Sequence, residues 1–242
     1  KKEDIFPCGF PQFDIYVNKK KYLSKEEFCQ KVGFDCAKPI ILYASEGLWT
    51  HWDAAYIEDL IKNYNILEKY NLILRPHFSN MQDKPYDQFS NYKGVYVDDK
   101  NVRLTTMFGD CWDPTFENMD WLAEIINVSD VVVTFMSTFV LDSFAYNKPV
   151  INIYYDLPAQ KADDKPVIPM GALYNCTHYN AVLAEKSTIL ARNGGDVMEW
   201  IEKFIANPEI LAHERQRTLD KLCYKLDGQS AKRIYQVIFN SM

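Results

Sequence analysis

Two apolar runs of this sequence end in polar side chains whose types suit the binding of an anion. The run Val131 to Phe135 is almost directly followed by Ser137 and Thr138, and a second run passes into Arg75 and His77. Hydroxyl and free backbone N–H groups at such a turn can hold a phosphate, and arginine can add a forked contact. Histidine can donate a hydrogen bond or a proton as a phosphate departs. The pattern therefore indicates a phosphate or diphosphate ligand.

Asp142 adds a carboxylate one helical turn beyond Thr138. In α/β folds that bind nucleotides, an acidic residue often accepts hydrogen bonds from ribose hydroxyls. Ordinary roles stay open for these residues. Ser137 or Thr138 can cap a helix, Asp142 can be a solvated first-turn acid, and His77 can be a satisfied surface or core residue.

A strand-turn-helix-strand unit over 131–154 positions the first set of residues. The β-branched run Val131 to Phe135 is typical of a strand that is covered on both faces of a parallel sheet. A helix over 139–146 follows, and it must end before Pro149, where the next strand, 150–154, begins. Ligands of open parallel sheets bind at the carboxyl ends of strands, which is where Ser137 and Thr138 lie.

An earlier unit repeats this arrangement. The sequence predicts a strand over 40–43, a turn over 44–47, a helix over 53–70 and a strand over 72–74. Ser45 and Gly47 then occupy the same topological place as Ser137 and Thr138, so we predict that they also contact the ligand. The alternative is a plain connecting loop.

The other elements complete an α/β fold with a Rossmann-like parallel sheet flanked by helices. Ser24 and Glu27 form a capping-box pattern for a helix that Gly33 ends. The loop 108–117, rich in aromatic and acidic residues, either stacks on a nucleobase or covers the core. Segment 8–16 is turn-like, and the apolar residues of this opening are too few to enclose a core, so we predict a lead-in and linker segment over 1–37 and one domain over 38–242. Further strands are predicted over 92–98, 102–107 and 178–183, and helices over 119–128, 196–206, 208–226 and 230–239.

Composition narrows the classes of function. The net charge is -6 without a basic block, which argues against nucleic acid and against a polybasic membrane anchor. The six cysteines and four histidines are dispersed, so neither a metal site nor a disulfide scaffold is predicted. No apolar run approaches the roughly 18 residues of a spanning helix, and the first residues do not resemble a signal peptide. We expect a cytoplasmic protein.

Five segments, in this order, resemble one family. The sequence is similar to the carboxyl-terminal half of a GT-B glycosyltransferase, and most of all to the CDP-glycerol glycerophosphotransferases and related surface-polysaccharide transferases. The segments that carry the resemblance are GFPQFD at 9–14, KPIILYAS at 38–45, LILRPH at 72–77, SDVVVTFMSTFVLDSFAYNKPVI at 129–151 and KLDGQSAKRI at 225–234.

The resemblance implies one half of a GT-B fold that binds a nucleotide-diphosphate donor in polysaccharide biosynthesis. His77 matches the catalytic residue that faces the donor phosphates, and Ser137 with Thr138 matches the diphosphate-binding pair. Asp142 matches the acid that binds the ribose, although it is shorter than the glutamate common there. The implied donor is a nucleotide-activated sugar or CDP-glycerol, and the acceptor is a glycan or lipid-linked molecule. No metal or other cofactor is implied.

The resemblance also implies a partner that this sequence lacks, the amino-terminal Rossmann domain with the acceptor site. We therefore expect a half that is inactive alone and whose parent associates peripherally with the inner face of the plasma membrane through that missing half. Two alternatives stay open. One is an enzyme similar to UDP-sugar 2-epimerases, which share the fold, and the other is a catalytically silent module that binds a nucleotide or a partner.

Overall fold

A parallel sheet forms the centre of the chain in the computed structural model, which describes residues 5–19, 21–47, 53–78, 85–100, 113–157 and 168–240. Within these ranges the sheet has six strands in the order β3-β2-β1-β4-β5-β6. The chain thus moves outward from β1 on one side and from β4 on the other, so the strand order reverses between these two. The strands are β1 (Ile40–Ala44), β2 (Asn71–Arg75), β3 (Val95–Val97), β4 (Val131–Thr134), β5 (Val150–Ile153) and β6 (Ile189–Ala191).

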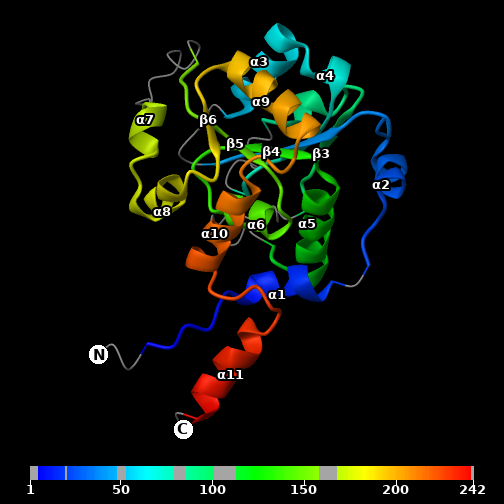
Figure 1. Ribbon diagram of the computed structural model, residues 1–242. Coiled ribbons are helices and arrows are strands. Elements are labelled where there is room, and N and C mark those ends of the chain that lie inside the picture. Colours follow the sequence, from blue (N-terminus) through cyan, green and yellow to red (C-terminus); the bar gives the residue numbers. More distant parts are fainter. Residues whose placement is uncertain are drawn as a thin grey trace.

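Helices cover both faces of the sheet, as Figure 1 shows. Three helices lie on one face: α3 (Asp53–Tyr64), α4 (Ile66–Lys69) and α9 (Gly194–Ala206). On the other face are α5 (Phe116–Val128), α6 (Phe139–Ala145) and α10 (Ala212–Leu222). The short α7 (Met170–Leu173) and α8 (Thr177–Glu185) lie beside β6, whereas α11 (Ser230–Asn240) projects from the body.

Burial explains why the central strands form. Every residue of β1, β2, β4 and β5 is buried, which is the pattern of strands covered by helices on both faces. In the register of the sheet, Leu42 of β1 pairs with Ile73 of β2 and with Val132 of β4. The predicted fold class, an α/β Rossmann-like parallel sheet flanked by helices, is confirmed.

Several predicted elements need correction. Residues 178–183 form part of α8 and not a strand, because Tyr179 and Val182 are buried at helical spacing. The sheet instead ends with β6. The predicted helix over 53–70 is interrupted at Asn65, whose φ of 51° is left-handed. The helix predicted over 208–226 covers only α10, preceded by Leu211 at φ 61°. The strand predicted over 102–107 and most of the loop 108–117 lie outside the described residues.

The lead-in segment is helical where the sequence suggested a turn. Helix α1 (Pro11–Asn18) begins with proline at its first turn, a position that proline favours. Its buried residues Phe13 and Tyr16 join the core, and α1 packs against α5, α6 and α11. Helix α2 (Lys25–Val32) has the predicted capping box and ends at Gly33, which has a left-handed φ of 79°. The boundary at residue 37 stays a prediction.

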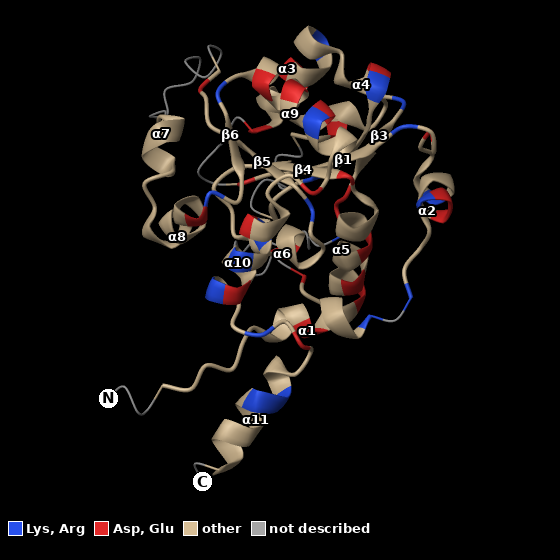
Figure 2. Ribbon diagram, viewed as in Figure 1, with Lys and Arg blue, Asp and Glu red and all other residues tan. Residues whose placement is uncertain are grey.

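Charged residues are mixed on the surface. Figure 2 shows acidic and basic positions next to each other along α2, α4 and α10. Among the helices that the structure describes, none combines the length and the hydropathy that crossing a membrane requires.

Candidate functional site

A polar pocket of about 280 Å³ lies beyond the carboxyl ends of β2 and β4. It brings together five residues that the sequence singled out: Arg75, His77, Ser137, Thr138 and Asp142. The point where strand order reverses is the usual place for a ligand in an open α/β sheet. The other lining residues are Gln12, Phe78, Asp113, Asn118, Met119, Leu122 and Phe139.

The turn after β4 contributes two hydroxyl groups with different surroundings. The Ser137 Oγ accepts a hydrogen bond of 3.3 Å from the Phe139 N–H, so Ser137 does cap the start of α6. Thr138 is exposed at the N-cap position of α6, and its side chain makes no capping hydrogen bond. Thr138 is therefore the more available donor in this turn.

The end of β2 places a paired cation in the pocket. Arg75 is 9% exposed, and its Nη1 donates to the carboxylate of Asp98, which is fully buried. The other carboxylate oxygen of Asp98 accepts a hydrogen bond of 2.9 Å from the Trp121 indole N–H. Because Asp98 occupies part of the Arg75 fork, the predicted two-pronged contact with a phosphate must use the remaining N–H groups of the guanidinium.

His77 is a neutral group at pH 7 in this structure. Burial and, to a smaller extent, the positive charge of Arg75 lower the pKa of His77 to about 4. Its backbone N–H donates to the Ser45 Oγ at 3.1 Å, which fixes the chain directly after β2. The Phe78 ring lies 4.2 Å from the imidazole ring between centroids. A neutral imidazole can still donate one hydrogen bond into the pocket.

Asp142 is buried, which rules out the interpretation of a solvated first-turn acid. Its Oδ1 accepts hydrogen bonds from the Tyr16 hydroxyl at 2.5 Å and from the Gln12 amide at 3.0 Å. Burial raises the pKa of Asp142 to about 6, against the lowering effects of Tyr16, Arg75 and Gln12. At neutral pH the carboxyl group is therefore mostly ionised and can accept hydrogen bonds.

The structure does not bring Ser45 and Gly47 to this pocket. Besides accepting from His77, the Ser45 hydroxyl bonds the buried carboxylate of Asp53. The backbone N–H groups of Glu46 and Gly47 also point to Asp53 Oδ2, at 3.2 and 3.4 Å. The turn after β1 thus uses its polar groups to hold the start of α3.

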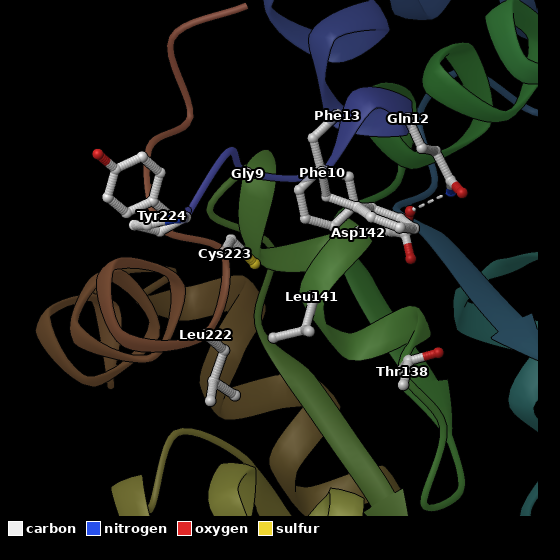
Figure 3. A pocket seen from close by; sticks show the side chains of 11 residues that line it. Gly9, Phe10, Gln12, Phe13, Thr138, Leu141, Asp142, Leu222, Cys223 and Tyr224 are labelled. Atoms are coloured by element: carbon white, nitrogen blue, oxygen red, sulfur yellow. Dashed lines mark hydrogen bonds between the residues drawn. The ribbon is translucent and has the colours of Figure 1, made fainter. Parts of the chain in front are cut away.

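A second, mostly apolar pocket of about 470 Å³ adjoins the first (Figure 3). Gln12, Thr138 and Asp142 line both pockets, so the Gln12–Asp142 hydrogen bond lies on the border between them. The remaining lining residues are Pro7, Gly9, Phe10, Phe13, Leu141, Leu222, Cys223 and Tyr224.

Reasoning from the sequence missed Gln12, Tyr16 and Asp98. The signal for the first two was the proline at position 11, which favours the first turn of a helix, with Phe13 and Tyr16 three residues apart on one face. No local pattern marks Asp98 as the partner of Arg75. In the described part of the chain, no group of three or more histidine, cysteine or acidic residues is arranged to hold a metal ion.

The sheet order and the helices on both of its faces define a Rossmann-like α/β domain of the kind found in GT-B enzymes. The chain belongs to the family described as CDP-Glycerol:Poly(glycerophosphate) glycerophosphotransferase, whose family model matches residues 1–240. Compared by sequence with curated proteins, the chain has no significant match.

Solved structures share this fold at low sequence identity. The wall teichoic acid polymerase TagF matches with a TM-score of 0.62 and 16% identity over 100% of this chain and 52% of TagF. A TagF variant soaked with CDPG has a TM-score of 0.58 at 16% identity, over 100% of this chain and 53% of TagF. A UDP-N-acetylglucosamine 2-epimerase matches at 0.51 and 14% identity, over 100% of this chain and 53% of the epimerase. The chain spans about half the length of these proteins.

Proposed function

We propose that this chain is the donor-binding domain of a transferase that uses CDP-glycerol in the synthesis of a cell-surface poly(glycerophosphate). Two lines of support meet in one place. The family is described by this donor and this polymer, and the polar pocket of this chain gathers a cation, two hydroxyl groups, an imidazole and a carboxylate where nucleotides bind in related sheets. The convergence of these groups in one pocket is the observation that carries the proposal.

Each group has a part of the donor that it suits. The Thr138 and Ser137 hydroxyls and the free N–H groups of Arg75 are hydrogen-bond donors, as the diphosphate requires. Asp142 is an acceptor at neutral pH and suits the ribose hydroxyls. The hydrogen-bond donors lie near β2 and β4, whereas the acceptor lies on α6. This separation sets the orientation of the nucleotide in the pocket.

His77 is assigned to the leaving group. In the transfer, an acceptor hydroxyl gives its proton to water or to a base of the acceptor-binding half. Its oxygen forms a bond to the phosphorus of the glycerol phosphate, and the bond from that phosphorus to the oxygen of CMP breaks. The departing CMP phosphate keeps the electron pair. Its negative charge beside His77 favours the protonated imidazole and so opposes the burial and the Arg75 charge that now lower the pKa of this residue. His77 can then donate to the leaving oxygen.

The acceptor and the remaining half of the active site come from outside this chain in the proposal. A second Rossmann domain would close over the polar pocket and bring a glycan or lipid-linked acceptor to it. The support is that the chain covers about half of each matched polymerase structure. We place the parent enzyme in the cytoplasm at the inner face of the plasma membrane, where a nucleotide donor and a lipid-linked acceptor can meet.

A binding screen tests the proposal. The thermal unfolding midpoint of the chain should rise with CDP-glycerol and CMP more than with UDP- or GDP-sugars, because a ligand that binds only the folded state stabilises it by mass action. A Ser137→Ala, Thr138→Val double variant should lose most of this rise. No response to any cytidine nucleotide, or the same response in the double variant, would overturn the assignment. Epimerised sugar formed from UDP-N-acetylglucosamine without an acceptor would support the epimerase alternative.

A further inference from the structure

The acid assigned to the ribose is held by residues from the opposite end of the chain. Both hydrogen bonds to Asp142 come from α1, more than 120 positions earlier in the sequence, and both reach the same oxygen, Oδ1. Within the described ranges, no other residue forms a hydrogen bond with Oδ2. Figure 3 shows this second oxygen directed away from Gln12.

Tyr16 is held rigidly in the position from which it donates. Its ring is buried and lies between the rings of Phe13, at 5.4 Å, and Tyr146, at 5.3 Å between centroids. The Tyr22 hydroxyl donates to the Tyr16 carbonyl at 3.1 Å and lies 2.8 Å from the Tyr146 hydroxyl. Tyr146 is the residue at which α6 ends, so α1 contacts α6 both at Asp142 and at the carboxyl end of the helix.

Helix α11 in turn holds α1 in place. The Asp14 carboxylate accepts hydrogen bonds from the backbone N–H groups of Ser230 and Ala231, at 3.0 and 2.9 Å, at the start of α11. The Arg233 Nε donates to the Cys8 carbonyl at 2.8 Å. Because α1 is anchored to both α6 and α11, it can fix the orientation of a side chain that it contacts.

We infer that Gln12 and Tyr16 are positioning residues of the donor site, which orient the Asp142 carboxylate so that Oδ2 accepts from the ribose of the nucleotide. The inference rests on the proposed function. It gives the two contacts of α1 a role, because they set the direction of the short Asp142 side chain. The lead-in helix thereby becomes part of the ligand site.

The groups around Asp142 determine whether its carboxyl group is ionised or neutral. Burial favours the neutral acid and raises its pKa, whereas the Tyr16 hydroxyl, the Arg75 guanidinium and the Gln12 amide lower it. The Cys223 thiol beyond α10 also faces Asp142, and burial, with a smaller effect of this carboxylate, keeps the pKa of Cys223 raised to about 12. Removing the Tyr16 hydroxyl must therefore raise the pKa of Asp142 further.

Calorimetric titration of the whole chain with CDP-glycerol at pH 6 and pH 8 tests the inference. For Tyr16→Phe we expect binding about fivefold weaker than wild type at pH 6 and closer to wild type at pH 8, since a pKa raised by roughly one unit matters most near the pKa. Gln12→Leu should shift the profile in the same direction. Tyr92→Phe removes the hydroxyl of an exposed tyrosine outside both pockets and should follow wild type at both pH values.

A direct measurement separates this inference from the proposed function. The carboxyl ¹³C signal of Asp142, assigned by its loss in Asp142→Asn, gives the pKa of this residue without any ligand. A higher pKa in Tyr16→Phe and an unchanged one in Tyr92→Phe support the positioning role even if CDP-glycerol does not bind. An unchanged pKa in Tyr16→Phe overturns it, even if CDP-glycerol binds to the wild-type chain and Asp142→Asn weakens that binding.

Discussion

The turns after β1 and β4 hold equivalent places in the sheet and have different uses. Both follow fully buried strands, and both carry hydroxyl groups, from Ser45 after β1 and from Ser137 and Thr138 after β4. After β4, the exposed Thr138 makes no capping bond and lines both pockets. After β1, Ser45 is 7% exposed and bonds the His77 backbone and the Asp53 carboxylate. Equivalent topology thus predicts where a polar group lies and not whether a ligand can reach it.

The turn after β1 still serves the pocket, through its neighbour. By accepting from the N–H of His77, Ser45 fixes the first residues after β2, which carry the imidazole. In our account, the turn after β4 contacts the ligand, and the turn after β1 supports His77, which follows β2 and also lines the pocket. The predictions below test this division of roles.

The largest effect is expected at Arg75, which contacts the ligand in our account and also stabilises the fold. Arg75→Met should lower the free energy of unfolding by about 3–5 kcal/mol, because it leaves the buried Asp98 carboxylate without its cation. Denaturation in urea measures this change. The matched control is Arg217→Met, which removes a half-exposed cation from Glu185 while Lys221 stays paired with that carboxylate, and it should cost much less. Equal losses in the two variants would show that the Arg75 pair is not structural.

Thr138 should affect binding and not stability. Thr138→Val removes a hydroxyl that contacts a charged phosphate in our account, so the affinity for CDP-glycerol should fall about tenfold or more. The free energy of unfolding should change by about 0.5 kcal/mol or less, since the side chain is exposed. Thr177→Val, at an exposed threonine of α8 outside both pockets, is the control. Unchanged affinity in Thr138→Val would remove this residue from the site.

Ser45 should show the opposite behaviour. Ser45→Ala leaves the partly buried N–H of His77 without its acceptor, which should cost about 1–3 kcal/mol of stability. The affinity of the folded protein for CDP-glycerol should change by about threefold or less, which calorimetry below the unfolding temperature can measure. A large loss of affinity at unchanged stability would instead place Ser45 in contact with the donor, as the sequence suggested.

At neutral pH the smallest effect is that of His77, which changes stability only as the pH falls. Its pKa is lowered from about 6.5 in the unfolded chain to about 4 in the fold, so the unfolded state binds the proton first as pH falls. The contribution of His77 to stability is thus complete above pH 6.5 and is lost between about pH 6.5 and 4. His77→Gln should gain stability relative to wild type across this window. Parallel curves of stability against pH for the two proteins would contradict the burial of a neutral imidazole.

Much of the fold could be predicted because its central strands are apolar runs bounded by turns. The segment 131–135 and the polar residues after it gave both a strand and the edge at which a ligand binds. Helix α8 was missed because its short apolar segment fits a strand as well as a helix. Helix α1 was missed because Pro11 lies in a segment that resembles a turn, although proline also favours the start of a helix.

The site could be predicted where it depends on strand ends and not where it depends on distant contacts. Arg75, His77, Ser137 and Thr138 follow from topology, since parallel strands end at one edge. The contacts of Tyr16 with Asp142 and of Ser45 with the His77 backbone join segments that are 126 and 32 residues apart. No periodicity encodes such pairs, because they depend on how helices and loops pack in three dimensions.

A crystal structure of the chain with CDP-glycerol tests the central claim most directly. Our account predicts the diphosphate within hydrogen-bond distance of the Thr138 hydroxyl and the free guanidinium N–H groups of Arg75, with a ribose hydroxyl on Asp142 Oδ2. A nucleotide bound at another place on the chain, with these three side chains free of it, would contradict the account.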